Sequence, residues 1–192
     1  LRKFYTSDAG YALAKQVDTD LIQLGRGANG GTQAATTYTG GIIGSTGAAY
    51  TSGSSNAAAI ADAGIRKAIQ LLDDDDVPMD NRFLVVPPVA RNSMMGLARF
   101  TEQAFVGEMG GSNTIRNGQI GDVYGVKVFV STNCDTAAGN TASDRVCLMF
   151  HKDAFVLAEQ MAVRSQTQYM QQYLATLYTA DTLYGVKELR DE

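Results

Sequence analysis

Apolar side chains in the first part of the chain recur at the spacing of an α-helix. The positions that follow this period are Leu13, Val17, Leu21 and Leu24. They predict a helix over residues 7–24, with Ser7 capping its first turn and Gly25 ending it. Residues 25–59 then turn to Gly, Ser, Thr and Ala with single apolar positions between them, which is typical of extended irregular chain or weak strand.

A second helical pattern leads into a short apolar strand. Its apolar positions are Ile60, Gly64, Ala68, Ile69 and Leu72, and Asn56 is a suitable cap. Four consecutive carboxylates, Asp73 to Asp76, oppose the dipole at a helix C-terminus, so the helix is predicted to stop there. Residues 82–86 (RFLVV) predict a buried strand that Pro87 and Pro88 end, and residues 89–105 resume a helical pattern.

The second half of the chain predicts more strands. Residues 107–118 form a glycine-rich loop, residues 124–130 alternate as a half-buried strand does, and residues 146–150 (VCLMF) read as another strand. We expect the last two to be neighbours around the polar stretch 133–144. The segment from residue 169 to 179 fits a helix or a long strand equally well, because it combines helical spacing with aromatic and β-branched residues.

Composition and charge limit the function. The chain has 192 residues, 45% of them hydrophobic, and can bury one sizeable core or two lobes. A net charge of -4 argues against tight binding to nucleic acid, which needs a basic face. No apolar run approaches the roughly 20 residues of a membrane helix, and no export signal is expected. Cys134 and Cys147 are expected to be reduced thiols.

The candidate chemical motifs are weak. Gly25, Gly27 and Gly30 satisfy GxGxxG by letter, but they follow a helix, whereas a dinucleotide-binding loop follows a strand and opens a helix. The unbroken aspartate run lacks the alternate spacing of a calcium loop. His151 is the single histidine and is expected to lie at a strand boundary. No catalytic residue, cofactor site or metal site is therefore predicted.

Three segments, in order, resemble the major capsid proteins of tailed bacteriophages. In residues 60–88 the matching positions are Leu72, Val77, Pro78, Arg82, Val85, Val86 and Pro88. Residues 118–133 (GQIGDVYGVKVFVSTN) are similar to a strand pair of that family, and residues 155–160 with 180–190 are similar to its closing ribbon. Together the three segments cover most of residues 60–190.

The resemblance implies an α+β fold of the Hong Kong 97 type, with a spine helix, a peripheral (P) domain and an axial (A) domain. Residues 1–59 would hold the spine helix and a peripheral segment, residues 60–155 mainly the axial domain, and residues 156–192 the return strands of the peripheral domain. On this template residues 7–24 are the spine helix and the ambiguous C-terminal segment is β. The N-terminal arm and extended loop of the family do not precede the spine helix in this sequence, so a truncated or processed chain is expected.

The implied function is that of a major capsid protein that assembles, in hexamers and pentamers, into an icosahedral shell around a phage genome. The expected location is the virion, after assembly in the host cytoplasm, with scaffolding, portal or decoration proteins as further candidate partners and no membrane. DNA would be enclosed without tight specific binding. Two alternatives stay open: an encapsulin-like nanocompartment shell, and a nucleotide-binding α/β enzyme that uses Gly25–Gly30.

Two sets of residues are candidates for contacts between copies. The expected charged inter-subunit contacts are Asp73, Asp74, Asp75, Asp76, Arg82 and Arg116. The loop at the centre of the capsomer is expected to be residues 133–144 or residues 107–118. Both sets are hypotheses about how one copy meets the next.

Overall fold

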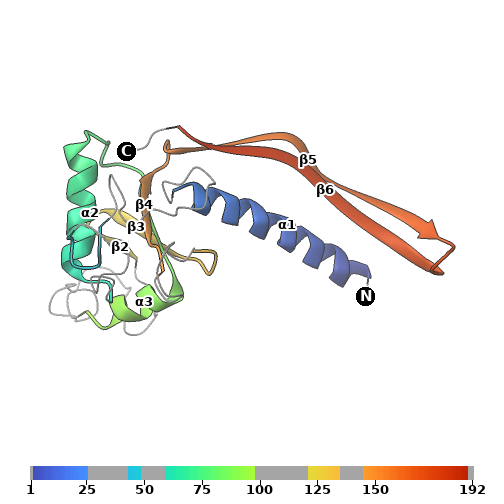
Figure 1. Ribbon diagram of the computed structural model, residues 1–192, viewed down its shortest axis with the longest axis horizontal. Helices are drawn as coiled ribbons and strands as arrows, with labels where there is room; N and C mark the ends of the chain where they lie inside the picture. Colours follow the sequence, from blue (N-terminus) through green and yellow to red (C-terminus); the bar gives the residue numbers. More distant parts are fainter. Residues whose placement is uncertain (1, 26–42, 49–58, 98–120, 135–144, 190–192) are drawn as a thin grey trace.

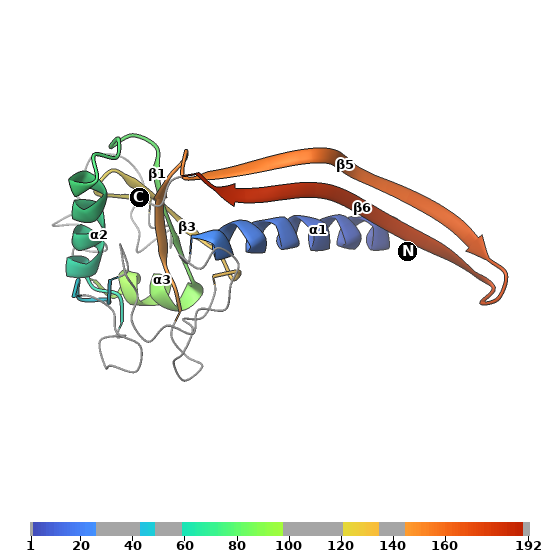
Figure 2. The same ribbon diagram turned by 45° about the horizontal axis from the view of Figure 1, so that its top comes forward.

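The protein has a rounded head from which a long arm extends (Figures 1 and 2). The computed structural model describes residues 2–25, 43–48, 59–97, 121–134 and 145–189. The head contains α2 (Asp62–Asp74), α3 (Pro88–Met95), β1 (Arg82–Val86), β2 (Asp122–Val123), β3 (Val126–Val130) and β4 (Leu148–His151). The arm consists of α1 (Arg2–Leu24) and a ribbon of two strands, β5 (Phe155–Met170) and β6 (Ala175–Glu188).

The head sheet has the strand order β2-β3-β1-β4. β1 pairs in parallel with β3, with Phe83 opposite Lys127, and antiparallel with β4, with Phe83 opposite Phe150. The prediction that β3 and β4 are neighbours is therefore wrong, because β1 lies between them. The apolar run RFLVV explains this position, since a strand with partners on both sides and apolar side chains is best buried at the centre of a sheet.

One face of the sheet carries the core. Leu84 and Val86 of β1 pack with Ile65 of α2 and with Ala90 and Met94 of α3. The opposite face carries a chain of aromatic rings. Their centroids lie 6.0 Å apart for Phe83 and Phe129, 5.9 Å for Phe83 and Phe150, and 5.1 Å for Phe150 and Phe155. The last pair continues the packing from the head into the first residue of the ribbon.

The helices differ from the predicted ones mainly at their ends. α1 begins at Arg2, so Ser7 lies inside the helix and does not cap it; no glycine or proline separates the two positions. The residue that caps α2 is Ala61, not Asn56, which lies outside the described residues. The helical pattern predicted over 89–105 is not one continuous helix, because α3 ends at Met95 with Gly96 as its cap; residues 98–105 lie outside the described residues.

The C-terminal segment is β, as the family resemblance implied. β5 and β6 pair antiparallel from Phe155 opposite Glu188 to Met170 opposite Ala175. The register shifts twice, between Glu159 and Met161 and between Met161 and Arg164. The strands are joined by a turn at residues 171–174, in which Leu174 has a positive φ of 47°.

The glycine-rich region after α1 is described only at residues 43–48. This short segment lies against the start of α2 in the head, where the Ala61 amide donates to the Ser45 carbonyl at 3.3 Å. The predicted domain division placed this segment with the first helix, within residues 1–59. The domain boundaries at residues 59 and 155 stay a prediction.

Candidate assembly surfaces

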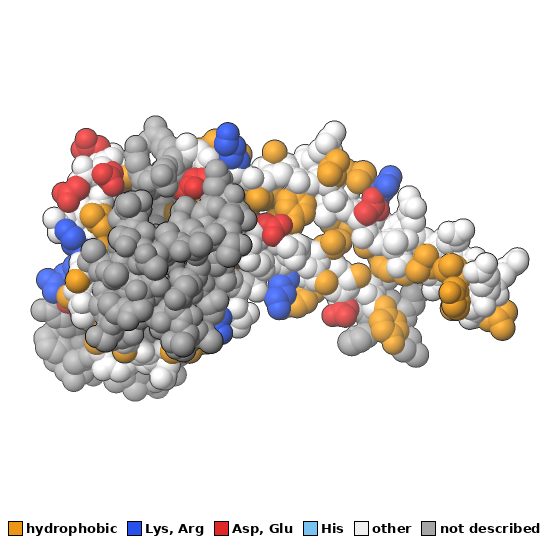
Figure 3. Space-filling view, in the orientation of Figure 1, with side chains coloured by type: hydrophobic (Ala, Val, Ile, Leu, Met, Phe, Trp, Pro, Cys, Tyr) orange, Lys and Arg blue, Asp and Glu red, His pale blue; other side chains and the backbone are white. Residues whose placement is uncertain are grey.

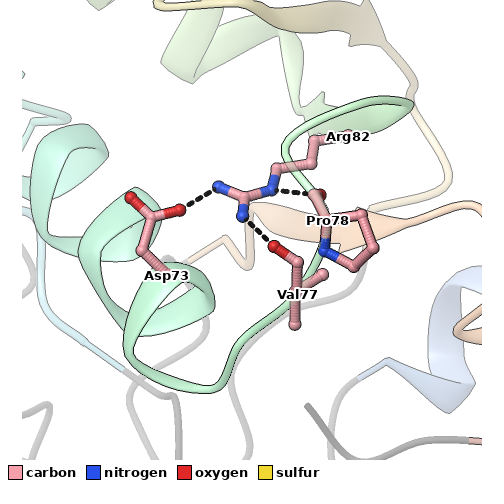
Figure 4. Close-up of polar contacts among 4 residues, drawn as sticks. All are labelled: Asp73, Val77, Pro78 and Arg82. Carbon is pink, nitrogen blue, oxygen red and sulfur yellow. Dashed lines mark hydrogen bonds and ion pairs between the residues drawn. The ribbon is translucent and has the colours of Figure 1, made fainter.

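Arg82 ties the end of α2 to the start of β1 (Figure 4). Its guanidinium donates to the carbonyl of Val77 at 2.5 Å and to that of Pro78 at 2.9 Å, and it pairs with the Asp73 carboxylate at 2.7 Å. The Arg82 side chain is only 3% exposed, and a buried charge is costly unless it has partners. Two carbonyl oxygens and one carboxylate provide these partners for the guanidinium. Arg82 and Asp73 thus fix the helix-to-strand join within one copy of the chain.

The other aspartates of the run stay on the surface. Asp74, Asp75 and Asp76 are exposed, and the Asp74 carboxylate accepts a hydrogen bond from Gln70 at 3.3 Å. Asp75 caps the helix, and Asp76 adopts a positive φ of 56°. The remaining candidate, Arg116, lies outside the described residues. A contact between these aspartates and a neighbouring copy stays a prediction.

The motifs that could suggest an enzyme have structural roles where the structure describes them. Gly25 ends α1, and a Cβ there would collide with Leu148 and Phe155, so this glycine permits close packing of the helix on the head. Residues 26–30 lie outside the described residues. His151 is the last residue of β4, and its Nδ1 accepts a hydrogen bond from the backbone amide of Asp153 at 3.3 Å. Among the described residues no cluster of three or more metal-ligating side chains occurs.

Both cysteines are free, as the sequence predicted. Burial raises the pKa of Cys147 to about 12, with a further contribution from Cys134 nearby, and burial also raises the pKa of Cys134. Because the thiolate is the reactive form, a raised pKa lowers the reactivity of both side chains at neutral pH. They act as small apolar groups in the head.

Apolar side chains lie exposed along the whole arm (Figure 3). On the ribbon the large ones are Val156, Leu157, Val163, Tyr169, Tyr173, Leu174, Leu177 and Leu183, and on α1 they are Tyr5 and Tyr11. The most exposed are at the free end of the ribbon, where Tyr173 is 73% and Leu174 is 82% exposed. Single exposed apolar residues are ordinary, but a series of them along one projecting element marks an interaction surface.

The arm also lacks a core of its own. Of the described side chains of α1, Leu24 alone is buried. The ribbon has two strands, and an isolated two-stranded ribbon is at best marginally stable in water. Within the described part of the chain no third strand pairs with the ribbon, so the outer edges of β5 and β6 offer backbone donors and acceptors to another chain.

Sequence analysis missed this surface. β5 carries apolar residues on both of its faces, with Val156, Leu157 and Val163 all exposed. A strand that is apolar on both faces is normally buried on both faces. This apolar pattern on both faces of β5 could therefore have predicted a surface for contact with another chain.

The fold of the chain is similar to three solved structures from phages, two of which are described as capsids. A structure from Mycobacterium phage Che8 matches with a TM-score of 0.69 at 19% identity, over 97% of this chain and 59% of that one. Cyanophage P-SCSP1u matches with a TM-score of 0.67 at 18% identity, over 100% and 63%. The mature capsid of bacteriophage PhiM1 matches with a TM-score of 0.63 at 18% identity, over 98% and 62%.

This chain thus spans about three fifths of the length of the matched chains. No curated protein matches it by sequence. The model of one protein family, described as phage capsid protein, matches residues 1–190, which is nearly the whole chain. The head, the spine helix and the ribbon agree with the Hong Kong 97-type architecture that the sequence resemblance implied. The chain belongs to the phage capsid protein family.

Proposed function

We propose that this chain is the shell-forming part of a major capsid protein, and that many copies of it assemble into the closed icosahedral shell of a phage. The observation that carries the proposal is the arm, whose helix and ribbon present apolar side chains with no core beneath them. An arm of this kind gains stability when other chains cover it. The family membership and the fold support the same conclusion.

The shape of the molecule suits repeated contacts between copies. The arm and the head are different surfaces, so an arm that contacts a neighbour's head makes a heterologous contact, which closes into rings when the rotation allows it. Each contact can be weak, because a subunit in a shell is held by several neighbours at once. Hexamers and pentamers, with portal, scaffolding or decoration proteins as additional partners, are the assemblies that this function requires.

The proposed contents and location follow from the same function. A chain with a net charge of -4 is suited to enclosing DNA without binding it tightly, because tight binding needs a basic surface that displaces counterions. The subunit would be made and assembled in the host cytoplasm and would end in the virion. No helix in the described part of the chain is long and apolar enough to cross a membrane.

The two alternatives have less support. The family and the three solved structures from phages favour a virus shell over an encapsulin-like compartment. Of the residues that the nucleotide-binding alternative would use, Gly25 ends α1 and packs against the head, and residues 26–30 lie outside the described residues. We propose that the chain has no enzymatic activity.

The tip of the ribbon offers a direct test of the assembly surface. Leu174→Asp is expected to reduce particle yield at least about tenfold, because a charge at an apolar contact is costly to bury and the cost is repeated in every subunit. Gln172→Asp is the matched control, since it adds the same charge to the same exposed turn without removing apolar surface. Sedimentation of purified assemblies measures the yield. Equal yields from the two variants would show that the tip does not make contacts between copies.

The acidic turn is the second proposed contact. Replacing Asp74, Asp75 and Asp76 together by asparagine keeps their size and removes their charge, while Asp73 is left to pair with Arg82. We expect fewer particles, or particles whose yield no longer falls with added salt, because salt screens exposed charge pairs. Unchanged yield at both low and high salt would remove the acidic turn from the interface.

A further inference from the structure

The last turns of α1 contact the head and the ribbon at the same time. The Asp18 carboxylate accepts a hydrogen bond from the side-chain amide of Asn133 at 3.2 Å, just beyond the end of β3. The Asp20 carboxylate accepts one from the hydroxyl of Tyr184 in β6 at 2.6 Å. The two partners lie 115 and 164 residues away in sequence, so these are tertiary contacts.

Side chains that are two residues apart on an α-helix are separated by a rotation of about 200° around the helix axis. Asp18 and Asp20 therefore point to opposite sides of α1, one toward the head and one toward the ribbon. Figures 1 and 2 both show α1 beside the ribbon, with its C-terminal end against the head. At that end Leu24 is buried and Gly25 packs against Leu148 and Phe155.

Apart from α1, the described ribbon meets the head at its base, where Phe155 of β5 packs on Phe150 of β4. Beside it the amide of Leu189 donates to the carbonyl of Ala154 at 2.8 Å, which extends the pairing of the two ribbon strands beyond Phe155 and Glu188. Both contacts lie at the base of the ribbon, close to the point where it leaves the head. A ribbon that contacts the head only at its base can pivot on the head. A helix such as α1, which contacts both the head and the ribbon away from that base, fixes the angle between them.

We propose that Asp18 and Asp20 are positioning residues that brace α1 between the head and the ribbon and so set the angle of the arm on the head. If the chain is a shell subunit, as proposed above, this angle sets how one copy presents its arm to the next and therefore contributes to the curvature of the shell. The hydrogen bond to Asp20 raises the pKa of Tyr184, which keeps the phenol protonated as a donor.

The angle can be measured by electron paramagnetic resonance between two spin labels on one chain. Labels at Met79→Cys on the head and Gln172→Cys at the ribbon tip, in a Cys134→Ala and Cys147→Ala background, report the arm angle as a distance. Both labelled positions are exposed. Dilution with unlabelled protein restricts the signal to distances within one chain.

The background protein is expected to give one narrow distance peak. Asp18→Ala with Asp20→Ala should broaden the peak and shift its mean, and Tyr184→Phe with Asn133→Ala, which removes the donors, should do the same. Asp18→Asn with Asp20→Asn should restore the narrow peak, because amide oxygens accept the same hydrogen bonds. Asp8→Ala, an exposed aspartate of the same helix, is the matched control and should leave the peak unchanged.

The brace is overturned if the double alanine variant gives the same distance distribution as Asp8→Ala. The brace is also overturned if the double asparagine variant gives the same broadened distance distribution as the double alanine variant. Disruption of α1, and not loss of the two hydrogen bonds, would then explain the result. The outcome does not depend on shell formation. If the background protein never forms particles but the distances shift as expected, the proposed function fails and the brace stands.

Discussion

At the scale of single residues, Gly64 shows how closely the elements of the head approach one another. It lies in α2, where a Cβ would collide with the carbonyl of Ser45 in the neighbouring backbone segment. Backbone cannot move aside as the end of a flexible side chain can. The glycine is therefore required by packing, although glycine weakens a helix interior by roughly 0.5–1 kcal/mol relative to alanine.

Gly64→Ala is expected to destabilise the chain by about 1–3 kcal/mol, as overpacking in a tight site does. Gly10→Ala is the matched control, because Gly10 is exposed in α1 with open space around it. There the same change should stabilise by up to about 1 kcal/mol. Urea unfolding of both variants measures the difference. Destabilisation of equal size at the two positions would contradict the packing argument.

Arg82 shows what a residue pattern predicts and what it leaves open. Arg82 was identified from the sequence because it is one of the positions that match the family pattern, at the start of the strand over residues 82–86. Its role could not be read from the pattern, because a charged residue beside four aspartates fits a surface patch as well as a buried join. Only the positions of Val77 O, Pro78 O and the Asp73 carboxylate show that the charge acts within the chain.

At the scale of elements, periodicity located most helices and strands but not their neighbours. The strand over 82–86 matches β1 because an apolar run between an acidic turn and two prolines has few alternatives. The prediction that the strands at 124–130 and 146–150 are neighbours was wrong, since the parallel pairing of β1 with β3 depends on contacts distant in sequence. The ribbon could be assigned as β only through the family resemblance, because its own pattern fits both periods.

The ribbon should be the least protected regular element of the free subunit. Its strands have one partner each, whereas β1 has partners on both sides. Backbone amides of β5 and β6 are expected to exchange with deuterium at least about tenfold faster than those of β1 before assembly, and to slow on assembly. Hydrogen exchange with mass spectrometry measures both states. Equal protection of the ribbon and β1 in the free subunit, with no change on assembly, would contradict the view that the arm needs a partner.

At the scale of the whole molecule, the chain divides into a head that buries a core and an arm that does not. The head is held by the cluster around Leu84, Val86 and Met94 and by the join at Arg82. The arm exposes Tyr173, Leu174 and other apolar side chains over both of its elements. This division agrees with the proposed function, in which other copies of the chain cover the arm.

The central claim is that copies of this chain complete one another in a closed shell. Electron microscopy of the full-length gene product, purified under native conditions, tests it most directly. The account predicts closed particles of uniform diameter with the arm of each subunit covered by neighbouring subunits. A population made only of monomers or small open oligomers, with the arm exposed to solvent, would contradict it.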